Sequence, residues 1–383
     1  MTVRGVIIIE GHVQGLSNAR SAAELNLPVW VMHNGNCIAS SSKSCQKFIH
    51  CHPYNSNNFI EDLINLGTEN NLRDWLIIPS NDYAVLNIAR NELKLSKFYK
   101  TFSSDFKILE RIIDKSALMA LATNCNVPIP ETYKTNENGD FFHNDFNFPV
   151  LTRGTIGQDF YKKIGVKALK SNNPEELKIN LNTIGDHFDI SQTLTQELIE
   201  TRNGTKSITV STCCLCLNGI ILNLWMGEKL NEHPLSYGTA TLARSIEVKE
   251  LEEPTQKLIK ELEYTGVCEI EWLYNAKQKR YNLIEVNPRT WLWIELAKAS
   301  GIDFIKDVIQ ISSGKEVLKN KTYETDIYWF NPITYYPFKV LAMLKNVKSY
   351  RPKGKTVNAL FKKGDNKPGW TYLWTLFNIL KRR

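Results

Sequence analysis

The sequence predicts an α/β protein whose first domain is built on a parallel sheet. Residues 3–9 (VRGVIII) are typical of a buried strand, the following LSNARSAAELN of a helix, and PVWVMH of a second strand. Apolar runs separated by an amphipathic helix indicate a βαβ unit. The chain has 383 residues, which exceeds the roughly 100–200 of one domain, so we expect two or three packed units.

Composition restricts the class of protein further. Hydrophobic residues make up 43% and charged residues 23%, which is ordinary for a globular chain and argues against disorder or a collagen-like repeat. The apolar run before Glu10 is too short for a secretory signal and far short of the ~18 residues that span a bilayer. Eight cysteines are scattered along the chain, which predicts reduced thiols in a cytoplasmic protein.

The net charge of +7 is concentrated at the C-terminus. Residues 335–383 contain twelve Lys or Arg and one acid, Asp365, which gives +11 there and leaves −4 for the rest of the chain. Such a segment contacts nucleic acid, an anionic membrane surface or an acidic partner, or it is a solvated surface.

Further elements follow in order along the first unit. The strand WLIIP (75–79) ends at Ser80-Asn81-Asp82, where α/β sheets place ligand groups. The glycine spacing after the first strand is GxxxG, so the GxGxxG dinucleotide fingerprint is absent. A helix over residues 105–124 closes this unit, and VPIPETY (127–133) is a proline-marked connection.

The next unit is predicted to combine strands and helices. The strand FPVLTRG (148–154) leads into a loop with glycines at 154, 157 and 165, and IGVKALK is another strand. NPEELKINLNTI is a helix with Asn173 as its cap and Pro174 at its first position. Strand-rich and helical segments then alternate: SQTLTQELIE, SITVSTCCLCL and GIILNLWMG are strands, and residues 254–264 are a helix.

The chemistry is predicted to lie on a hairpin formed by VCEIEWLYN and RYNLIEVN. Glu269 and Glu271 point to one face of the first strand, and Glu285, Asn287 and Arg289 alternate in the same way on the second. Glu271, Glu285 and Asn287 are oxygen donors of the kind that Mg²⁺ prefers, and Arg289 is placed to bind a phosphate oxygen.

The alternative is an exposed hairpin with cross-strand charges. The apolar residues that alternate with the polar ones, Ile284, Val286 and Pro288, argue against it, as does the Trp-rich helix WLWIELAKASG predicted directly after the hairpin.

Residues 266–303 resemble the metal-binding end of ATP-grasp enzymes, in which a Glu is followed fourteen residues later by E-x-N-x-R. DKSALMALATNCNVPIPETY resembles the start of the ATP-grasp domain, with Lys115 as the first nucleotide lysine. FPVLTRGTIGQDF resembles the strand and glycine loop, Gly154 and Gly157, that cover the phosphates, and QELIE the hinge that holds adenine through Gln196, Glu197 and Ile199. The resemblance covers residues 3–305 and is most specific at E-x-N-x-R.

The resemblance implies an ATP-grasp fold of two α+β subdomains preceded by a Rossmann-like parallel-sheet domain, as in carbamoyl-phosphate-synthase-like and D-aspartate-ligase-like enzymes. The expected divisions are an N-terminal domain (1–105), a small or lid subdomain (106–195), a catalytic subdomain (196–320) and a basic aromatic extension (321–383).

One position departs from the family pattern. The family has a lysine on the strand before the glycine loop, and here PVLTRG places Arg153 there. Arginine keeps the positive charge but has a wider fork. Lys162 or Lys163 is the alternative to it.

The implied activity is that of an ATP-dependent carboxylate–amine ligase with an acyl-phosphate intermediate, using ATP and Mg²⁺, or Mn²⁺ in its place. Lys115 and Arg153 would hold the α- and β-phosphates, Arg289 would stabilise the transferring group, and the loop of Gly154 and Gly157 would act as a lid. Lys229 resembles the basic residue beside the acyl phosphate, although a surface lysine is the alternative.

The substrates are expected to be small carboxylates and amines, with no nucleic acid, and an analogy with related ligases suggests cell-wall or surface-polysaccharide precursors. His233, Trp291 and Trp293 are candidate substrate contacts, against a solvated loop histidine and core indoles. The rival functions are a nucleotide-binding module without turnover and a phosphotransferase. The sequence leaves donor, acceptor and oligomeric state open.

Two other signals have structural explanations. Cys213, Cys214 and Cys216 lie in an apolar strand without a second pair at zinc spacing, so we interpret them as buried thiols, and Cys45 with HCH (50–52) in the same way. Residues 369–383 combine aromatic residues with a basic end. They are either a helix at an anionic membrane surface or a C-terminal helix packed on the body.

Overall fold

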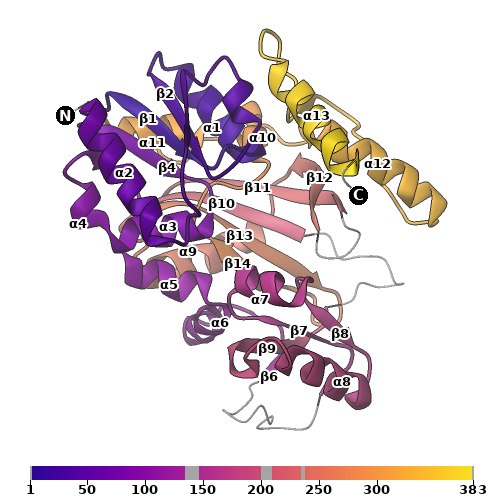
Figure 1. Ribbon diagram of the computed structural model, residues 1–383. Helices are drawn as coiled ribbons and strands as arrows, with labels where there is room; N and C mark the ends of the chain where they lie inside the picture. Colours follow the sequence, from indigo (N-terminus) through magenta and orange to yellow (C-terminus); the bar gives the residue numbers. More distant parts are fainter. Residues whose placement is uncertain (1, 134–145, 200–208, 234–237, 382–383) are drawn as a thin grey trace.

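The computed structural model describes residues 2–133, 146–199, 209–233 and 238–381, and side chains up to residue 375. Three sheets form the framework (Figure 1). The N-terminal five-stranded sheet lies above a central seven-stranded sheet, and a small four-stranded sheet lies below.

The N-terminal sheet is parallel, with strand order β3-β2-β1-β4-β5. Its strands are β1 (Gly5–Ile9), β2 (Val29–His33), β3 (Lys47–His50), β4 (Trp75–Pro79) and β5 (Tyr99–Lys100). Its helices are α1 (Val13–Ala23), α2 (Asn57–Asn70), α3 (Asp82–Arg90) and α4 (Glu92–Leu95). The predicted βαβ unit is therefore confirmed. Because β1 lies between β2 and β4, the carboxyl ends of strands β1 and β4 lie side by side at the point where the strand order reverses.

The predicted single helix over residues 105–124 is wrong, because the chain forms two helices there. They are α5 (Phe106–Ile113) and α6 (Lys115–Asn124). Asp114 between them has an extended backbone, and its carboxylate accepts a hydrogen bond from the backbone N–H of Ala117. An aspartate in this geometry caps a new helix and interrupts the old one. Lys115 thereby becomes the first residue of α6.

The small sheet is antiparallel, with order β6-β9-β7-β8. Its elements are β6 (Thr132–Tyr133), β7 (Val150–Gly154), α7 (Gly157–Ile164), β8 (Leu169–Ser171), α8 (Pro174–Gly185) and β9 (Thr193–Glu197). The cap of α8 is as predicted, since Asn173 accepts from the backbone N–H of Glu176.

The expected loop around Gly157 and the strand IGVKALK are corrected. Gly157 begins helix α7, and this helix ends where Gly165 takes a left-handed φ of 81°. Of the predicted strand IGVKALK, only the last two residues, 169–170, enter β8.

The central sheet has the order β14-β13-β10-β11-β12-β15-β16. Its strands are β10 (Thr209–Leu217), β11 (Ile220–His233), β12 (Thr239–Ser245), β13 (Gly266–Asn275), β14 (Arg280–Asn287), β15 (Tyr328–Phe330) and β16 (Thr356–Asn358). The remaining helices are α9 (Glu252–Glu261), α10 (Ile294–Ser300), α11 (Phe304–Ser312), α12 (Pro332–Leu344) and α13 (Lys367–Lys381). Residues 321–383 thus add β15 and β16 to the same sheet that carries the predicted hairpin.

Each face of the central sheet carries a large hydrophobic cluster. One contains Trp225, Trp291 and Trp293 and joins this sheet to α1, α10 and α11. The other packs Trp272 and the thiols of Cys214 and Cys216 against α5, α6 and α9, whereas Cys213 belongs to the first cluster. All eight cysteines are free, as predicted. Among the described residues, no helix combines the length and the apolar character needed to cross a membrane.

Candidate active site

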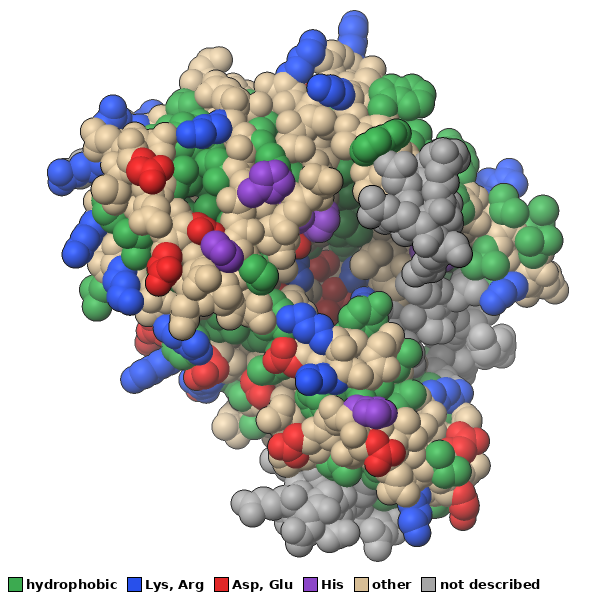
Figure 2. Space-filling model, viewed as in Figure 1, with side chains coloured by type: hydrophobic (Ala, Val, Ile, Leu, Met, Phe, Trp, Pro, Cys, Tyr) green, Lys and Arg blue, Asp and Glu red, His purple; other side chains and the backbone are tan. Residues whose placement is uncertain are grey.

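A cavity of about 880 Å³ lies where the three sheets meet. Figure 2 shows this hollow between the upper and lower parts of the molecule, with acidic and basic side chains inside it. Its wall includes nearly all of the predicted site residues: Lys115, Arg153, Gly154, Gly157, Gln196, Glu197, Ile199, Lys229, Glu271, Glu285, Asn287, Arg289 and Trp293.

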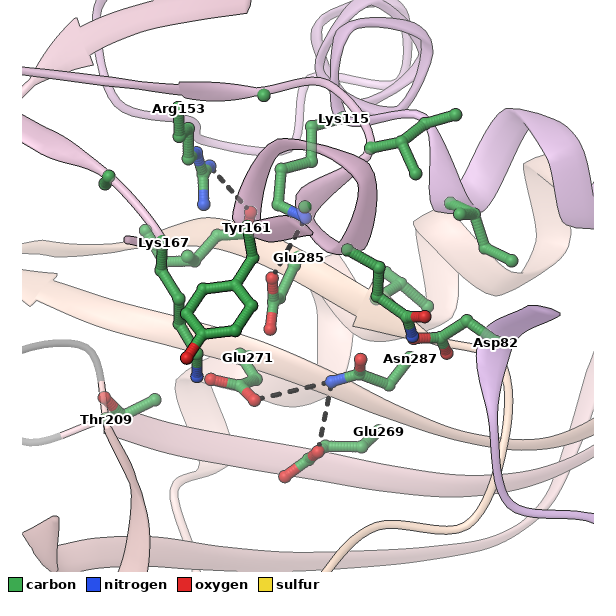
Figure 3. A pocket seen from close by; sticks show the side chains of 18 of the residues that line it. Asp82, Lys115, Arg153, Tyr161, Lys167, Thr209, Glu269, Glu271, Glu285 and Asn287 are labelled. Atoms are coloured by element: carbon green, nitrogen blue, oxygen red, sulfur yellow. Dashed lines mark hydrogen bonds and ion pairs between the residues drawn. The ribbon is translucent and has the colours of Figure 1, made fainter. Parts of the chain in front are cut away.

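The floor of the cavity is the hairpin of β13 and β14. In its register Glu271 lies opposite Glu285, and Glu269 lies opposite Asn287. The Asn287 amide donates to Glu271 Oε1 at 3.4 Å and to Glu269 Oε2 at 3.2 Å (Figure 3). The three predicted metal residues are therefore side by side. Glu269 joins them, and its period-two spacing from Glu271 already indicated that it shares their face.

Two lysines from other elements face these carboxylates. Lys229 Nζ lies 2.6 Å from Glu271 Oε1, and Lys115 Nζ lies 3.2 Å from Glu285 Oε2. Lys229 belongs to β11 and its side chain is 10% exposed, so it is not a surface lysine in a loop. The position of Lys115 follows from the helix break, because its backbone N–H at the start of α6 donates to the carbonyl of Thr155.

The pKa values of the two facing glutamates, Glu271 and Glu285, are shifted in opposite directions. Burial, the largest influence, would raise the pKa of Glu285, but Lys115, Arg153 and Lys229 together lower that pKa to about 2. Burial raises the pKa of Glu271 to about 7, with Glu269 and Glu285 adding to the rise and Lys229 opposing it. Repulsion from Glu269 and Glu285 contributes to the raised pKa of Glu271, and a cation bound between these carboxylates would relieve that repulsion.

The donor set fits a hard divalent cation. Glu271 and Glu285 supply carboxylate oxygens and Asn287 an amide oxygen, with Glu269 beside them. Oxygen donors of this number, without sulfur or imidazole, suit Mg²⁺ or Mn²⁺ rather than zinc.

The small sheet forms the opposite wall through Arg153. Its guanidinium donates to Gln196 Oε1 at 2.7 Å and to the carbonyl of Ile284 in β14 at 3.1 Å. Arg153 therefore lies in the cavity and ties the small sheet to the hairpin strand. Lys162, the alternative to it, also borders the cavity, but it is exposed and its Nζ lies 3.2 Å from the hydroxyl of Tyr83.

The two glycines of the predicted lid, Gly154 and Gly157, lie close to other groups of the protein. A Cβ on Gly154 would lie 2.4 Å from Cβ of Phe160, so a side chain there would displace α7. Gly157 is the first residue of α7, and a Cβ there would lie 3.4 Å from Lys115 Nζ. The element above the cavity is thus a short helix that rests on β7.

The N-terminal domain contributes residues that were not predicted as site residues. Asp82 Oδ1 accepts from Arg289 Nε at 2.6 Å, and Asp82 Oδ2 accepts from Gln158 of α7 at 2.9 Å. The neighbouring Tyr83 donates its hydroxyl hydrogen to Asp159 of α7. The signal was present in Ser80-Asn81-Asp82 at the end of β4, but the sequence did not show which groups would face it.

The three predicted substrate residues are separated by the structure. Trp291 is fully buried, lies outside the cavity wall and stacks on Trp225 with ring centroids 6.0 Å apart, so its predicted substrate contact is not supported. Trp293 is 1% exposed but borders the cavity. The predicted helix over these residues begins only at Ile294, so the spacing on a helix did not decide their directions. His233 is exposed at the end of β11 and outside the wall.

The geometry agrees with comparisons to known proteins. Residues 233–320 match the family described as carbamoyl-phosphate synthase L chain, ATP binding domain. The biotin carboxylase domain of Hydrogenobacter thermophilus 2-oxoglutarate carboxylase, solved with MgADP, ADP and bicarbonate, superposes with a TM-score of 0.66. The two are 16% identical, over 86% of this chain and 74% of that one. The chain has the ATP-grasp fold. The predicted resemblance to the ATP-grasp superfamily is confirmed.

Two ligases are also similar to this ATP-grasp chain. The L-amino acid ligase of Bacillus licheniformis has a TM-score of 0.62 and 13% identity, over 82% of this chain and 74% of that one. The D-aspartate ligase of Enterococcus faecium is 21% identical over 282 residues, which are 70% of this chain and 66% of that ligase, just under two thirds of its length. The matched proteins named here are thus two ligases and the biotin carboxylase domain of a carboxylase.

Proposed function

We propose that the chain is an ATP-dependent ligase that joins a carboxylate to an amine through an acyl phosphate. The observation that carries the proposal is the floor of the cavity. Glu271, Glu285 and Asn287 present oxygen donors beside Lys115 and Lys229, with Arg153 on the facing wall. Alternating negative and positive groups of this kind suit a triphosphate with its cation.

The roles on the nucleotide side follow from position. Lys115 and Arg153 lie on the side of the small sheet and would bind the α- and β-phosphates. Gln196, Glu197 and Ile199 border the same cavity at the end of β9, where they would hold adenine. Helix α7 would cover the phosphates and exclude water from a reactive intermediate.

The metal ligands would be Glu271, Glu285 and Asn287. A divalent cation bound there would supply positive charge to the phosphates at the moment when a second anion approaches. Lys115 and Lys229 contact these carboxylates in the structure. With the cation and the nucleotide bound, both lysines would turn from the carboxylates toward phosphate oxygens.

The chemical steps place Arg289 and Lys229 at the reacting groups. A carboxylate oxygen of the substrate attacks the γ-phosphorus and ADP leaves, while Arg289 stabilises charge on the transferring phosphoryl group. The amine then attacks the acyl carbon, phosphate leaves, and the amine loses a proton. Lys229, whose pKa is raised above its ordinary value because Glu271, Glu269 and Glu232 outweigh the effect of burial, stays cationic beside the acyl phosphate.

An amino acid as one substrate is part of the proposal. It is supported by the names of two matched proteins, D-aspartate ligase and L-amino acid ligase. A place in cell-wall or surface-polysaccharide precursor modification belongs to the same proposal and is supported only by analogy within the family.

The test is a phosphate-release screen with MgATP and pairs of amino acids and amino sugars, followed by hydroxylamine trapping. A ligase releases phosphate with a specific pair and yields a hydroxamate from the carboxylate substrate. ATP binding without ADP formation would identify a nucleotide-binding module instead. A stable phosphorylated product that gives no hydroxamate would identify a phosphotransferase.

A further inference from the structure

Helix α12 exposes an apolar face along its whole length. Tyr336, Val340, Met343 and Leu344 are 60%, 56%, 75% and 74% exposed. Their spacing of four, seven and eight residues places them on one side of the helix. The opposite side is attached to the body, since Tyr335 packs with Leu242 of β12 and Tyr328 of β15. The exposed face therefore has no covering element among the described residues.

Helix α13 repeats this arrangement beside it. Trp370 and Trp374 are 64% and 66% exposed and one helical turn apart. Its inner side is attached to the N-terminal domain, where the hydroxyl of Thr371 donates to that of Ser41. Both helices project together from one side of the molecule (Figure 1).

The segment around these helices is basic. Exposed cations follow α12 and precede α13: Lys345, Lys348, Arg351, Lys353 and Lys363. Asp365 is the one acid in residues 335–383, and its carboxylate accepts from the buried guanidinium of Arg20 at 2.9 Å. It therefore faces inward. Lys362 pairs with Glu24 and Lys355 with Glu324, but the five exposed cations named above form no ion pair with the residues that the structure describes. Figure 2 shows hydrophobic and basic side chains together at the right of the view, where α12 projects.

We propose that this α12–α13 surface docks on an anionic lipid bilayer, with both helices lying in the interface. Exposed Met, Leu, Val and Trp side chains can enter the boundary between headgroups and acyl chains, while lysine and arginine bind anionic headgroups. A second copy of the chain is a poorer occupant, because two like-charged surfaces would face each other. A nucleic acid would use the cations but would leave the apolar faces of both helices uncovered.

The surface is connected to the cavity through shared strands. Helix α12 packs against β11 and β12. Glu232 at the end of β11, and Thr239 and Ala240 at the start of β12, form part of the cavity wall. A docked molecule would therefore hold this end of its cavity close to the bilayer.

The test is sedimentation of the full chain with lipid vesicles. Binding is expected to vesicles of phosphatidylcholine with phosphatidylglycerol, to be weak with phosphatidylcholine alone, and to fall as salt rises above about 0.1 M. The affinity of the double variant Met343→Glu/Leu344→Glu for these vesicles is expected to be at least about tenfold lower than that of the wild type. The matched control is Leu93→Glu/Leu318→Glu, which adds the same charge at positions 88% and 74% exposed elsewhere, and should bind as the wild type does.

Three outcomes would overturn the proposal. The first is absence of binding to the anionic vesicles, and the second is an equal loss in the control variant. The third is a wild-type dimer that Met343→Glu/Leu344→Glu converts to a monomer while vesicle binding is absent, which would assign the surface to a second copy. Cooperative thermal unfolding and ATP binding of each variant confirm that it is folded, and neither readout requires the proposed ligase activity.

Discussion

Two glutamates, Glu285 in the cavity wall and Glu10 in the N-terminal domain, have pKa values that are shifted in opposite directions. Glu285, on the hairpin of β13 and β14, is surrounded by cations from three other elements, and its pKa falls to about 2 although burial opposes this. Glu10 follows β1 in the N-terminal domain, with its side chain 13% exposed. There burial prevails over Arg289 and raises the pKa to about 7.

The difference lies in how the cations are shared. Lys115, Arg153 and Lys229 are all directed at the hairpin, whereas Arg289 is bound to Asp82 and compensates Glu10 only in part. The surroundings of Glu285 therefore favour a permanent charge, whereas those of Glu10, like those of Glu271 on the hairpin itself, favour a proton that is held up to about neutral pH. Glu10 also has a left-handed backbone with φ of 74°, a strained conformation that is common at functional sites.

Glu285→Gln is expected to have the largest effect, because it removes the charge that distinguishes Glu285 from Glu10. The variant replaces an anionic metal donor by a weaker amide oxygen and removes the charge that pairs with Lys115, so we expect ATP-dependent phosphate release to fall by about 10²–10³-fold or more, with cooperative unfolding retained. The control is Glu253→Gln, because that side chain is 77% exposed on α9 and should not affect turnover. Near-normal turnover of Glu285→Gln would contradict the metal assignment.

Glu10→Gln tests the second glutamate of the comparison through the pH dependence of the free energy of unfolding. The folded pKa of about 7 lies above the ordinary 4.5, so the folded state binds more protons than the unfolded state between these values. The contribution of Glu10 to stability is then present below about pH 4.5 and is lost as the pH rises to about 7. The free energy of unfolding of the wild type should fall relative to Glu10→Gln by up to about 3 kcal/mol across this window.

Urea unfolding of the two proteins in the same buffers gives this measurement. Parallel stability curves between pH 4.5 and 7 would show that Glu10 is ionised throughout the window, and the contrast with Glu285 would disappear.

Asp82→Asn sharpens the comparison at the contact between the two regions. The variant keeps an oxygen for Gln158 but loses the charge that holds Arg289. We expect kcat to fall by about 10–100-fold with a smaller change in KM for ATP, since Asp82 acts by positioning Arg289. Asp74→Asn is the matched control, because Asp74 pairs with Lys100 in the same domain at 3.8 Å and away from the cavity. Equal losses in both variants would indicate a purely structural role.

Tyr83→Phe should have the smallest effect. It removes the hydroxyl that contacts Asp159 and Lys162 but keeps the ring beneath the Lys162 ammonium. Loss of these two hydrogen bonds, of which the one to Lys162 is exposed to solvent, should weaken the attachment of α7 by about 1 kcal/mol, or about fivefold in population. Hydrogen exchange of the α7 amides is the measurement, and Tyr161→Phe on the same helix is the control. Unchanged exchange in Tyr83→Phe would show that α7 is held by other contacts.

The site was predictable where the relevant geometry is local. Period-two alternation fixed which side chains of β13 and β14 share a face, and a short turn made those strands neighbours, so Glu271, Glu285 and Asn287 could be grouped from sequence. The cap of α8 was readable for the same reason. The break at Asp114 was missed because an aspartate between two apolar runs is compatible with one helix or with two.

The sequence by itself therefore determined the hairpin and its oxygen donors, because both depend on residues close together in the chain. Only the tertiary structure decided what faces them. Asp82 and Arg289 are 207 residues apart, and their contact depends on how the N-terminal sheet packs on the central one. The burial of Trp291 and the pairing of Lys229 with Glu271 depend on packing in the same way, since charge and burial are set by neighbours in space that no local spacing identifies.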